Sequence, residues 1–240
     1  MEIIRLDSTD STNNWASAHE HELPPIALVC CHEQTAGRGQ RGNVWESQPG
    51  KNITASLIFH PQEFPADQQF HISETVALAI VDFLKSYGVN AQIKWPNDIY
   101  VGDKKICGIL VEHVVSGRNI TRSIAGFGIN INQTRFLSDA PNPVSLTQIT
   151  GKDHDLDAAI HCIASILEKR LQSLNDKNSL HQEFLNSLWR KDGAYYNFFD
   201  RKNNEQINAS IQTVEPSGLL HLQTRNGETR TYSFKEVEYL

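Results

Sequence analysis

The chain has 240 residues, of which 39% are apolar and 21% are charged, as expected for a globular protein with one large domain, or one plus a small one. Its formal net charge of -6 repels phosphodiester backbones, so the composition disfavours general nucleic-acid binding. The sequence contains no secretory signal, no apolar run long enough for a membrane helix and no Cys-x-x-Cys spacing among its four cysteines, which predicts a cytoplasmic protein with reduced thiols.

The first half of the chain alternates strand and helix patterns. A strand over 2–6 precedes Asp10-Ser11-Thr12-Asn13, which supplies N-cap chemistry for a short helix through about Glu20. Two apolar strands, over 26–31 and 53–59, flank a glycine-rich segment. Apolar residues at helical spacing then predict a helix over 70–87 that ends at Gly88.

The second half predicts a sheet, two helices and a small β-domain. Four strands form an antiparallel meander, over 91–95, 97–101, 106–115 and 120–131. Helices over 155–174 and 180–189 would cover one face of that sheet, and short alternating strands begin at about Lys191. We therefore expect an α+β protein, with a mixed central β-sheet flanked by helices over 1–190 and a small β-domain over 191–240.

The most informative segment is the glycine-rich loop Gly37-Arg38-Gly39-Gln40-Arg41-Gly42-Asn43-Val44-Trp45. Its glycines let backbone N–H groups approach a ligand, its arginines offer guanidinium groups, and its tryptophan offers a flat apolar face. These features predict a loop that closes on a negatively charged small molecule. Arg-Gly stretches also occur in disordered RNA-binding tails, but there they repeat and lack flanking strands.

Three other motifs sharpen this prediction. Lys94-Trp95-Pro96-Asn97-Asp98 places a cation, an amide and a carboxylate around a stiff turn. In Lys104–Glu112, Lys105 precedes an apolar strand in which Gly108 leaves room for a ligand against the backbone. A similar gap is predicted at the two glycines of Gly126-Phe127-Gly128-Ile129-Asn130, which an amide follows. Ser11-Thr12-Asn13 and Gln34 offer neutral donors and acceptors suited to an uncharged polar head group.

Each motif also has a simpler interpretation. Lys94 and Lys105 could be solvated surface residues, and Ser11-Thr12-Asn13 could be only a helix cap. Trp45 could be a hydrophobic anchor, and the paired glycines Gly126 and Gly128 could serve a β-bulge. The ten histidines form no cluster at metal-ligand spacing near the motifs, so we expect no structural metal.

In order and spacing, these motifs closely resemble those of the biotin protein ligases, also called biotin-[acetyl-CoA-carboxylase] ligases. The resemblance covers nearly the whole chain and implies a class II synthetase/biotin ligase-like catalytic domain followed by an SH3-like domain. It also implies a two-step reaction. Biotin and MgATP first give biotinoyl-5'-AMP and pyrophosphate, and the acyl group then passes to one lysine of a biotin carboxyl carrier protein or domain.

The resemblance also implies roles for individual residues. The catalytic cations would be Arg38, Lys94 and Lys105. The biotin-binding residues would be Ser11, Thr12, Asn13, Gln34, Arg38, Gly39, Gln40, Lys105, Gly108 and Gly128. The ATP-binding residues would be Arg38, Arg41, Trp45, Lys94, Asn97 and Asn130. The implied cofactors are ATP, biotin and Mg²⁺, with Mg²⁺ bound only through ATP.

Two departures from the family pattern matter. Gln40 stands where family members with a Gly-Arg-Gly-Arg-Arg-Gly loop have a third arginine, so we expect retention of the adenylate to depend more on Arg38 and Arg41. Because Ser11-Thr12-Asn13 arrives within the first dozen residues, we expect no N-terminal DNA-binding domain and no repressor function.

Alternative functions remain open. A lipoate or octanoate ligase or transferase is disfavoured because its Arg-Arg-x-x-Gly-Gly-Gly segment and paired histidine motif are missing. The retained cations argue against a non-catalytic biotin-binding module. We expect no nucleic-acid or membrane partner, and both monomer and homodimer remain possible.

Overall fold

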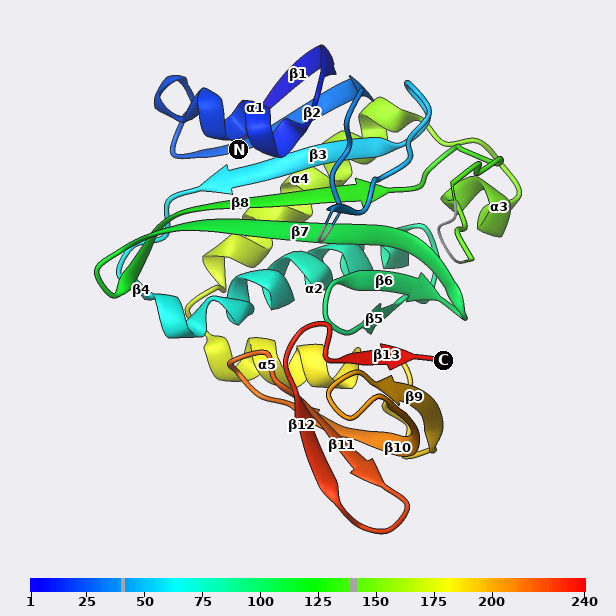
Figure 1. The fold of residues 1–240 in the computed structure, drawn as a ribbon. Coiled ribbons are helices and arrows are strands. Elements are labelled where there is room, and N and C mark those ends of the chain that lie inside the picture. Colours follow the sequence, from blue (N-terminus) through cyan, green and yellow to red (C-terminus); the bar gives the residue numbers. More distant parts are fainter. Residues whose placement is uncertain (40–41, 139–141) are drawn as a thin grey trace.

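The computed structural model describes residues 1–39, 42–138 and 142–240. Gln40 and Arg41, two of the expected site residues, lie outside the described residues. Within these ranges the chain forms a large mixed sheet with helices on both faces and a second, antiparallel sheet at the C-terminal end (Figure 1). The expected α+β fold class is therefore confirmed.

The large sheet has eight strands among the described residues, in the order β1-β2-β3-β8-β7-β6-β5, with β4 paired to β8. Its strands are β1 (Glu2–Thr9), β2 (Ile26–Gln34), β3 (Ile53–Phe59), β4 (Phe64–Pro65), β5 (Gln92–Lys94), β6 (Asp98–Val101), β7 (Lys104–Ser116) and β8 (Asn119–Ile129). The β1–β2 pair is parallel, whereas the other pairs are antiparallel. The meander from β5 to β8 confirms the expected antiparallel arrangement.

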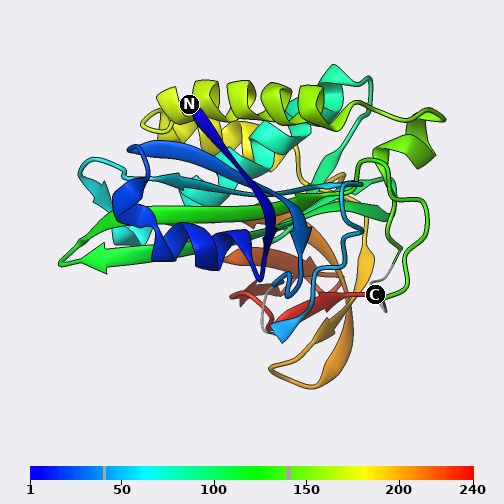
Figure 2. The same ribbon diagram turned by 90° about the horizontal axis from the view of Figure 1, so that it is seen from above.

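Helices cover both faces of this sheet, as Figure 2 shows from above. The helix α1 (Thr12–Ala18) packs on one face, and α2 (Phe70–Ser86) lies with α4 (Leu156–Gln172) on the other. Successive side chains of β2 point to opposite faces of the sheet, because side chains alternate along a strand. Leu28 joins the large core beneath α2 and α4, whereas Val29 joins the smaller core beneath α1.

Shorter helices complete the description. A capping box between Ser145 and Gln148 begins α3 (Leu146–Thr150), and one-turn 3-10 helices span Glu20–Glu22 and Ala66–Gln68. The helix α5 (Lys177–Asn186) begins and ends three residues earlier than the pattern predicts. The described residues contain no helix that is both long and apolar enough to cross a membrane.

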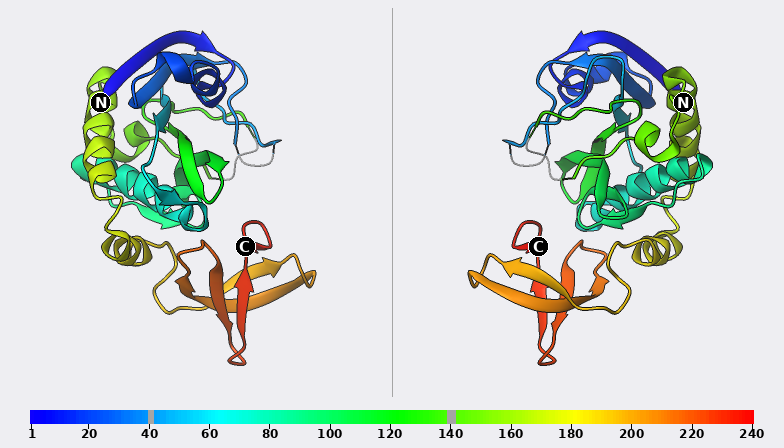
Figure 3. Two further views of the ribbon diagram at one scale, coloured as in Figure 1. Left: turned by 90° about the vertical axis from the view of Figure 1, so that its left-hand side faces the viewer. Right: turned by 90° about the vertical axis from the view of Figure 1, so that its right-hand side faces the viewer.

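The C-terminal sheet is antiparallel and has the order β12-β11-β10-β9-β13. Its strands are β9 (Tyr196–Asp200), β10 (Glu205–Val214), β11 (Leu220–Thr224), β12 (Thr229–Tyr232) and β13 (Val237–Tyr239). Figure 3 shows this sheet as a separate layer beside the large one. The expected C-terminal β-structure is confirmed, and the division between residues 190 and 191 stays a prediction.

The two sheets meet at an aromatic junction. The Trp95 indole N–H donates to the carbonyl of Gly218 at 3.0 Å, and the Phe234 ring lies 5.5 Å from the Trp95 ring. Gly218 has a φ of 91°, and a Cβ there would lie 2.9 Å from the ring of Phe70. Only glycine satisfies both the left-handed backbone and this close approach. The junction therefore fixes the C-terminal sheet against the strand that carries Lys94.

Candidate active site

The floor of the site consists of two glycines on neighbouring strands. Gly108 of β7 is the register partner of Gly128 of β8, and the Trp45 indole lies against both. A Cβ would lie 3.1 Å from the indole at Gly108 and 2.2 Å from it at Gly128. The described β7–β8 register shifts only at Val114/Val115, so the bulge interpretation of Gly128 is wrong. The glycines leave space above the sheet for Trp45.

Gly126 provides a second gap, which Asn13 of α1 fills. A Cβ at Gly126 would lie 2.3 Å from the Asn13 side-chain oxygen. The Asn13 amide donates to Glu112 at 2.7 Å, and its oxygen accepts from the Ser56 hydroxyl at 2.6 Å. Because the register is regular here too, the bulge interpretation also fails at Gly126. The gap positions one polar side chain at the end of a helix.

The helix cap at the start of α1 does not use the Ser11 side chain. Ser11 is the N-cap residue by position, but its hydroxyl makes no capping hydrogen bond. The backbone N–H and hydroxyl of Thr12 instead donate to the Gln34 side-chain oxygen at 2.8 and 3.2 Å. Ser11 and Thr12 are each 3% exposed, so these polar groups are buried beside the glycine floor. The cap-only interpretation therefore does not account for this segment.

The glycine-rich loop folds back on itself through backbone hydrogen bonds. The Trp45 N–H donates to the Gly37 carbonyl at 2.9 Å, and the Gly39 N–H donates to the Asn43 carbonyl at 2.7 Å. Arg38 pairs with Glu112. The Arg38 guanidinium also donates to the Asn14 side-chain oxygen at 2.6 Å. This segment therefore brings an arginine and a tryptophan over the sheet from opposite ends of the loop.

The expected lysines are not freely solvated. The Lys105 ammonium lies 2.7 Å from an Asp98 carboxylate oxygen and 5.7 Å from the centre of the Trp45 ring. Lys94 is half-buried and donates to the Tyr100 hydroxyl at 2.9 Å. Burial lowers the pKa of Lys94 and raises the pKa of Tyr100 to about 12. The surface interpretation of these lysines is wrong.

The two expected asparagines engage backbone carbonyls through their side-chain nitrogens. Asn97 donates to Ile109 at 2.6 Å, which joins the Pro96 turn to β7. Asn130 is 2% exposed and donates to Val144 at 3.1 Å, which joins the end of β8 to the segment before α3. Both amides therefore hold neighbouring segments of the site together.

Three cavities meet around Trp45. A narrow cavity of about 60 Å³ lies on the glycine floor, with room for only a few water molecules. Two larger cavities, of about 640 and 580 Å³, adjoin it, and Trp45, Asp98 and Lys105 line all three. The expected residues that line the narrow cavity are Ser11, Thr12, Asn13, Gln34, Arg38, Gly39, Trp45, Asn97, Lys105, Gly108 and Gly128. Lys94 lines both larger cavities, and Asn130 lines one of them.

A tie between two loops was missed from the sequence. The Glu46 carboxylate, one residue after Trp45, accepts from the backbone N–H groups of Leu137 and Ser138 at 3.0 and 2.7 Å. It also accepts from the Gln133 amide at 2.8 Å. Burial opposes ionisation of Glu46, but these hydrogen bonds together lower its pKa. The glycine-rich loop is thereby linked to the loop that follows β8.

Two further side chains of the site were not expected. Glu112 lies on β7 with Gly108 and Leu110 at alternate positions, and this period of two places them on one face. That pattern could have identified Glu112. Ser56 lies inside a strand of buried residues, where no sequence signal distinguishes it.

A second polar cluster lies outside the three cavities. His71, Glu74 and His181 bring their ligand atoms within 4.8 Å of one another, so they are close enough to hold a metal ion. The two histidine Nδ1 atoms lie 2.7 and 2.6 Å from separate oxygens of the buried Glu74 carboxylate, which are hydrogen-bond distances. No spacing in the sequence predicts this cluster, because His181 comes from a distant helix. This cluster fastens α5 to α2.

Comparisons with known proteins agree with this geometry. A profile of the Biotin/lipoate A/B protein ligase family matches residues 3–130. The chain is 31% identical to the bifunctional ligase/repressor BirA of Bacillus spizizenii, over 96% of this chain and 72% of that protein. It is 38% identical to the biotin-[acetyl-CoA-carboxylase] ligase of Paracoccus denitrificans, over 52% of this chain and 53% of that protein.

The fold has a close counterpart among solved structures. The biotin protein ligase from Aquifex aeolicus in complex with biotin and ATP superposes with a TM-score of 0.80 at 21% identity. The match covers 100% of this chain and 99% of that one. From the profile match and the relatives together, we conclude that the chain belongs to the biotin/lipoate A/B protein ligase family.

Proposed function

We propose that the chain is an ATP-dependent biotin protein ligase, a biotin-[acetyl-CoA-carboxylase] ligase. It would activate biotin as biotinoyl-5'-AMP and transfer the acyl group to a lysine of a biotin carboxyl carrier domain of a biotin-dependent carboxylase. The observation that carries this proposal is the arrangement of cavities. A narrow cavity lined by neutral polar residues and by Arg38 meets two larger cavities at a boundary that holds Lys105, Asp98 and Trp45.

The first step needs the cations at that boundary. A biotin carboxylate oxygen attacks the α-phosphorus of ATP, a bond forms between them, and the bond to the departing pyrophosphate breaks. Positive charge brings the two anions together and stabilises the pentacoordinate phosphorus. We assign Lys105 to the biotin carboxylate and Arg38 and Lys94 to the phosphates. Arg38 would exchange its contact with Glu112 for the nucleotide.

The narrow cavity would receive the biotin head group. Ser11, Thr12, Asn13 and Gln34 are neutral and can match the donors and acceptors of an uncharged ureido group. The backbone of Gly39 would follow the valeryl chain, above Gly108 and Gly128. The cavity of about 60 Å³ is narrow, so we expect Trp45 or Arg38 to move when the head group binds.

The larger cavities would receive the nucleotide. Trp45 would stack on adenine, Asn97 and Asn130 would position the nucleotide, and Arg41 would contact a phosphate. Mg²⁺ prefers oxygen ligands, commonly a carboxylate together with substrate phosphates. Asp98 is a carboxylate that lines all three cavities, so it suits an ion that arrives with ATP.

The second step would not need a covalent enzyme intermediate. The acceptor lysine, as a neutral amine, attacks the acyl carbon of biotinoyl-5'-AMP. An amide bond forms, AMP leaves with the electrons of the acyl–phosphate bond, and the attacking nitrogen releases one proton to solvent. The cavities next to Lys94 and Trp45, of about 640 and 580 Å³, would receive the extended acceptor lysine side chain.

The test is to incubate the protein with ATP, a biotin carboxyl carrier domain, and either biotin or lipoate. We expect the carrier mass to increase by one biotinoyl group, and a carrier with its acceptor lysine changed to arginine to remain unmodified. Modification by lipoate without modification by biotin would replace the proposal with a lipoate ligase. Biotin binding without any adduct or adenylate would indicate a non-catalytic binding module.

A further inference from the structure

Three aromatic rings surround the ammonium of Lys94. Its Nζ lies 4.6 Å from the ring centre of Tyr100, 5.2 Å from that of Trp189 and 5.0 Å from that of Tyr239. Each distance is within the range of a cation–π interaction. Tyr100 belongs to β6, Trp189 follows α5, and Tyr239 belongs to β13 of the C-terminal sheet. The cage therefore combines both sheets around the Lys94 ammonium, and the Arg190 guanidinium also lies 4.0 Å from the centre of the Trp189 ring.

Lys94 differs from the neighbouring cations in its electrostatic partner. Arg38 pairs with Glu112, and Lys105 pairs with Asp98. Within the described parts of the chain, Lys94 forms no ion pair within 4.0 Å, and its ammonium lies against the three rings and donates to the Tyr100 hydroxyl. Aromatic rings stabilise an ammonium without neutralising it. The cage thus holds a full positive charge at the edge of the larger cavities, available to an anion.

Several contacts hold the final strand, β13, in its position beside Lys94. Tyr239 pairs with Phe198 of β9, and the two rings lie 5.0 Å apart. The next residue, Leu240, donates its N–H to Asn197 at 3.0 Å and accepts from Arg190 at 3.2 Å. The Tyr239 hydroxyl is buried and has no hydrogen-bond partner among the described residues. Its ring, rather than its hydroxyl, therefore makes the useful contact.

We propose that Tyr239 is a positioning residue, through which the C-terminal sheet holds the Lys94 ammonium against the nucleotide phosphates. This inference rests on the proposed function, because it assigns Lys94 to ATP. If Tyr239 has this role, the large sheet alone does not form the complete site, because one ring around Lys94 comes from the C-terminal sheet. The ring of Tyr239 acts through Lys94 and does not contact the reacting atoms.

The same cage determines how Lys94 titrates. Burial is the main cause of the lowered pKa of Lys94 and outweighs the cation–π stabilisation of its charge, Asp98 opposes the shift, and Lys105 and Arg190 add to it. Tyr100 and Tyr239 also face the ammonium, but burial raises their pKa values, so they stay neutral while Lys94 titrates. Opening the cage at Tyr239 would move the pKa of Lys94 back toward that of an ordinary lysine. The loss of activity at high pH should then shift to higher pH.

The test measures biotin-dependent exchange of pyrophosphate into ATP by the full chain as a function of pH. For Tyr239→Leu, we expect kcat to fall roughly ten-fold, as for loss of a desolvated cation–π contact. KM for biotin should be retained, and the basic limb of the profile should shift upward. Tyr239→Phe keeps the ring and should restore most of the rate. Tyr195→Leu is the matched control, because Tyr195 is an exposed ring of the C-terminal region that contacts Arg225.

Two further measurements keep the outcomes distinct. In a Lys94→Met background, Tyr239→Leu should have no additional effect on kcat, and an additive loss would overturn the inference. The pH dependence of Lys94 acylation by a small reagent, followed by mass spectrometry, reports the pKa without enzyme activity. If the wild type shows no exchange, the proposed function fails. If Tyr239→Leu folds and leaves both the Lys94 pKa and kcat unchanged, the proposal that Tyr239 positions Lys94 is wrong. Should Tyr239→Leu unfold, Tyr239→Met is judged by the same two readouts.

Discussion

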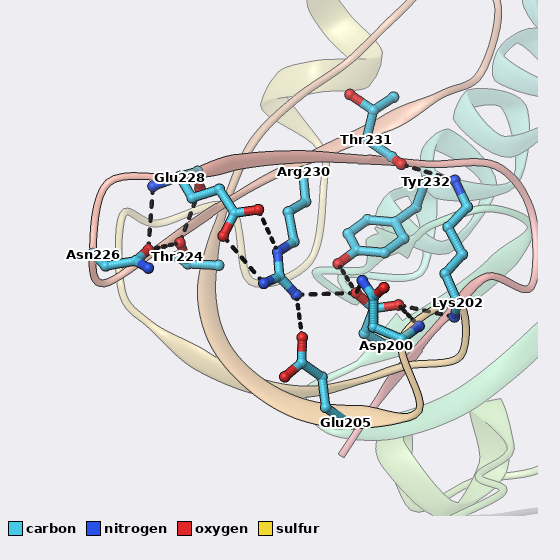
Figure 4. Close-up of polar contacts among 10 residues, drawn as sticks. Asp200, Lys202, Glu205, Thr224, Asn226, Glu228, Arg230, Thr231 and Tyr232 are labelled. Atoms are coloured by element: carbon cyan, nitrogen blue, oxygen red, sulfur yellow. Dashed lines mark hydrogen bonds and ion pairs between the residues drawn. The ribbon is translucent and has the colours of Figure 1, made fainter.

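Two regions of the molecule place carboxylates beside arginines, but they differ in how completely their polar groups are paired. In the C-terminal sheet, the Asp200 side chain is fully buried and accepts five hydrogen bonds (Figure 4). One oxygen accepts from Tyr232 at 2.8 Å, Asn203 at 2.9 Å and Arg230 at 3.1 Å, and the other accepts from two backbone N–H groups. Arg230 also pairs with Glu228 and Glu205.

The candidate active site is paired less completely. The Trp45 indole N–H is buried without a partner among the described residues, and Lys94 has rings in place of a carboxylate. Buried polar groups in proteins nearly always find partners, so an unpaired one requires a reason. A complete network stabilises the fold, whereas an incomplete one leaves donors for a ligand. Substitutions in the candidate active site should therefore reduce activity, whereas substitutions in the Asp200 network should reduce the free energy of unfolding.

The largest effect is expected for Lys105→Ala. Loss of the cation assigned to the biotin carboxylate should lower kcat/KM for adenylation by about 10²–10³-fold, as when one electrostatic stabiliser is removed. Thermal unfolding should change little, because the Lys105 partner Asp98 stays partly exposed to solvent. Pyrophosphate exchange measures the rate. Lys104→Ala, at the exposed neighbouring position, is the control. Equal losses in both variants would remove Lys105 from the site.

The reverse pattern is expected for Asp200→Asn. Because Arg230 would lose a buried partner, the free energy of unfolding should fall by about 3 kcal/mol while adenylation by the folded fraction is preserved. Burial opposes ionisation of Asp200, but its hydrogen bonds lower its pKa. The lowered pKa contributes stability above the ordinary aspartate pKa, and this contribution is lost as pH falls through the folded value.

Denaturant unfolding at several pH values checks the Asp200 prediction. The difference between wild type and Asp200→Asn should shrink in acid, because the wild-type carboxylate is then protonated. Glu228→Gln, which alters an exposed partner of the same arginine, should cost much less. A loss of adenylation that exceeds the loss of folded protein would contradict the separation between the two regions.

Much of the fold was accessible from local patterns. The strand β3 begins and ends as the apolar run predicts, and α2 begins at Phe70 and ends before Gly88. The two glycines Gly126 and Gly128 indicated a gap above the sheet because alternate residues share a face. Such features depend on neighbours in the sequence, so periodicity and turn chemistry identify them.

Other features depend on contacts that no local pattern encodes. Tyr239 reaches Lys94 from the end of the chain, and Glu46 caps backbone groups of a loop more than ninety residues away. The sequence identified Lys94 by its motif, but the cage around it required the packing of two sheets. The helix α3 was missed because its five residues are too short for a helical period. Partners distant in sequence therefore required the structure.

A moderate effect is expected for Gly128→Ala. Its Cβ would lie 2.2 Å from the Trp45 indole, so the indole must move off the floor. We expect biotin to bind about ten-fold more weakly, which corresponds to about 1.4 kcal/mol, through the displaced loop. Isothermal titration with biotin measures the affinity. The double variant with Trp45→Ala removes the clash, so the Gly128 substitution should then add little. A full additional loss in that background would show that the floor itself binds the ligand.

The smallest effect is expected for Glu46→Gln, because Glu46 is only partly buried, although both of its carboxylate oxygens accept hydrogen bonds, as those of Asp200 do. The amide keeps the shape of the side chain and loses the charge, which should cost about 0.5–1 kcal/mol in a partly exposed site. The direct readout is hydrogen exchange at the backbone amides of Leu137 and Ser138, which should speed up a few-fold. KM for ATP should rise by a similar factor.

The pH dependence makes the Glu46 prediction specific. Because the folded pKa of Glu46 is lowered, its tie is fully present above the ordinary glutamate pKa and weakens as pH falls through the lowered value. Protection of the two amides, corrected for intrinsic exchange, should therefore fall in acid for the wild type and stay flat for Glu46→Gln. Glu33→Gln, an exposed glutamate on β2, is the control. If hydrogen exchange at the two amides changes while KM for ATP does not, the contact between the two loops stabilises the fold without affecting ATP binding. Glu46 would then have the same role in the active-site region as Asp200 has in the C-terminal sheet.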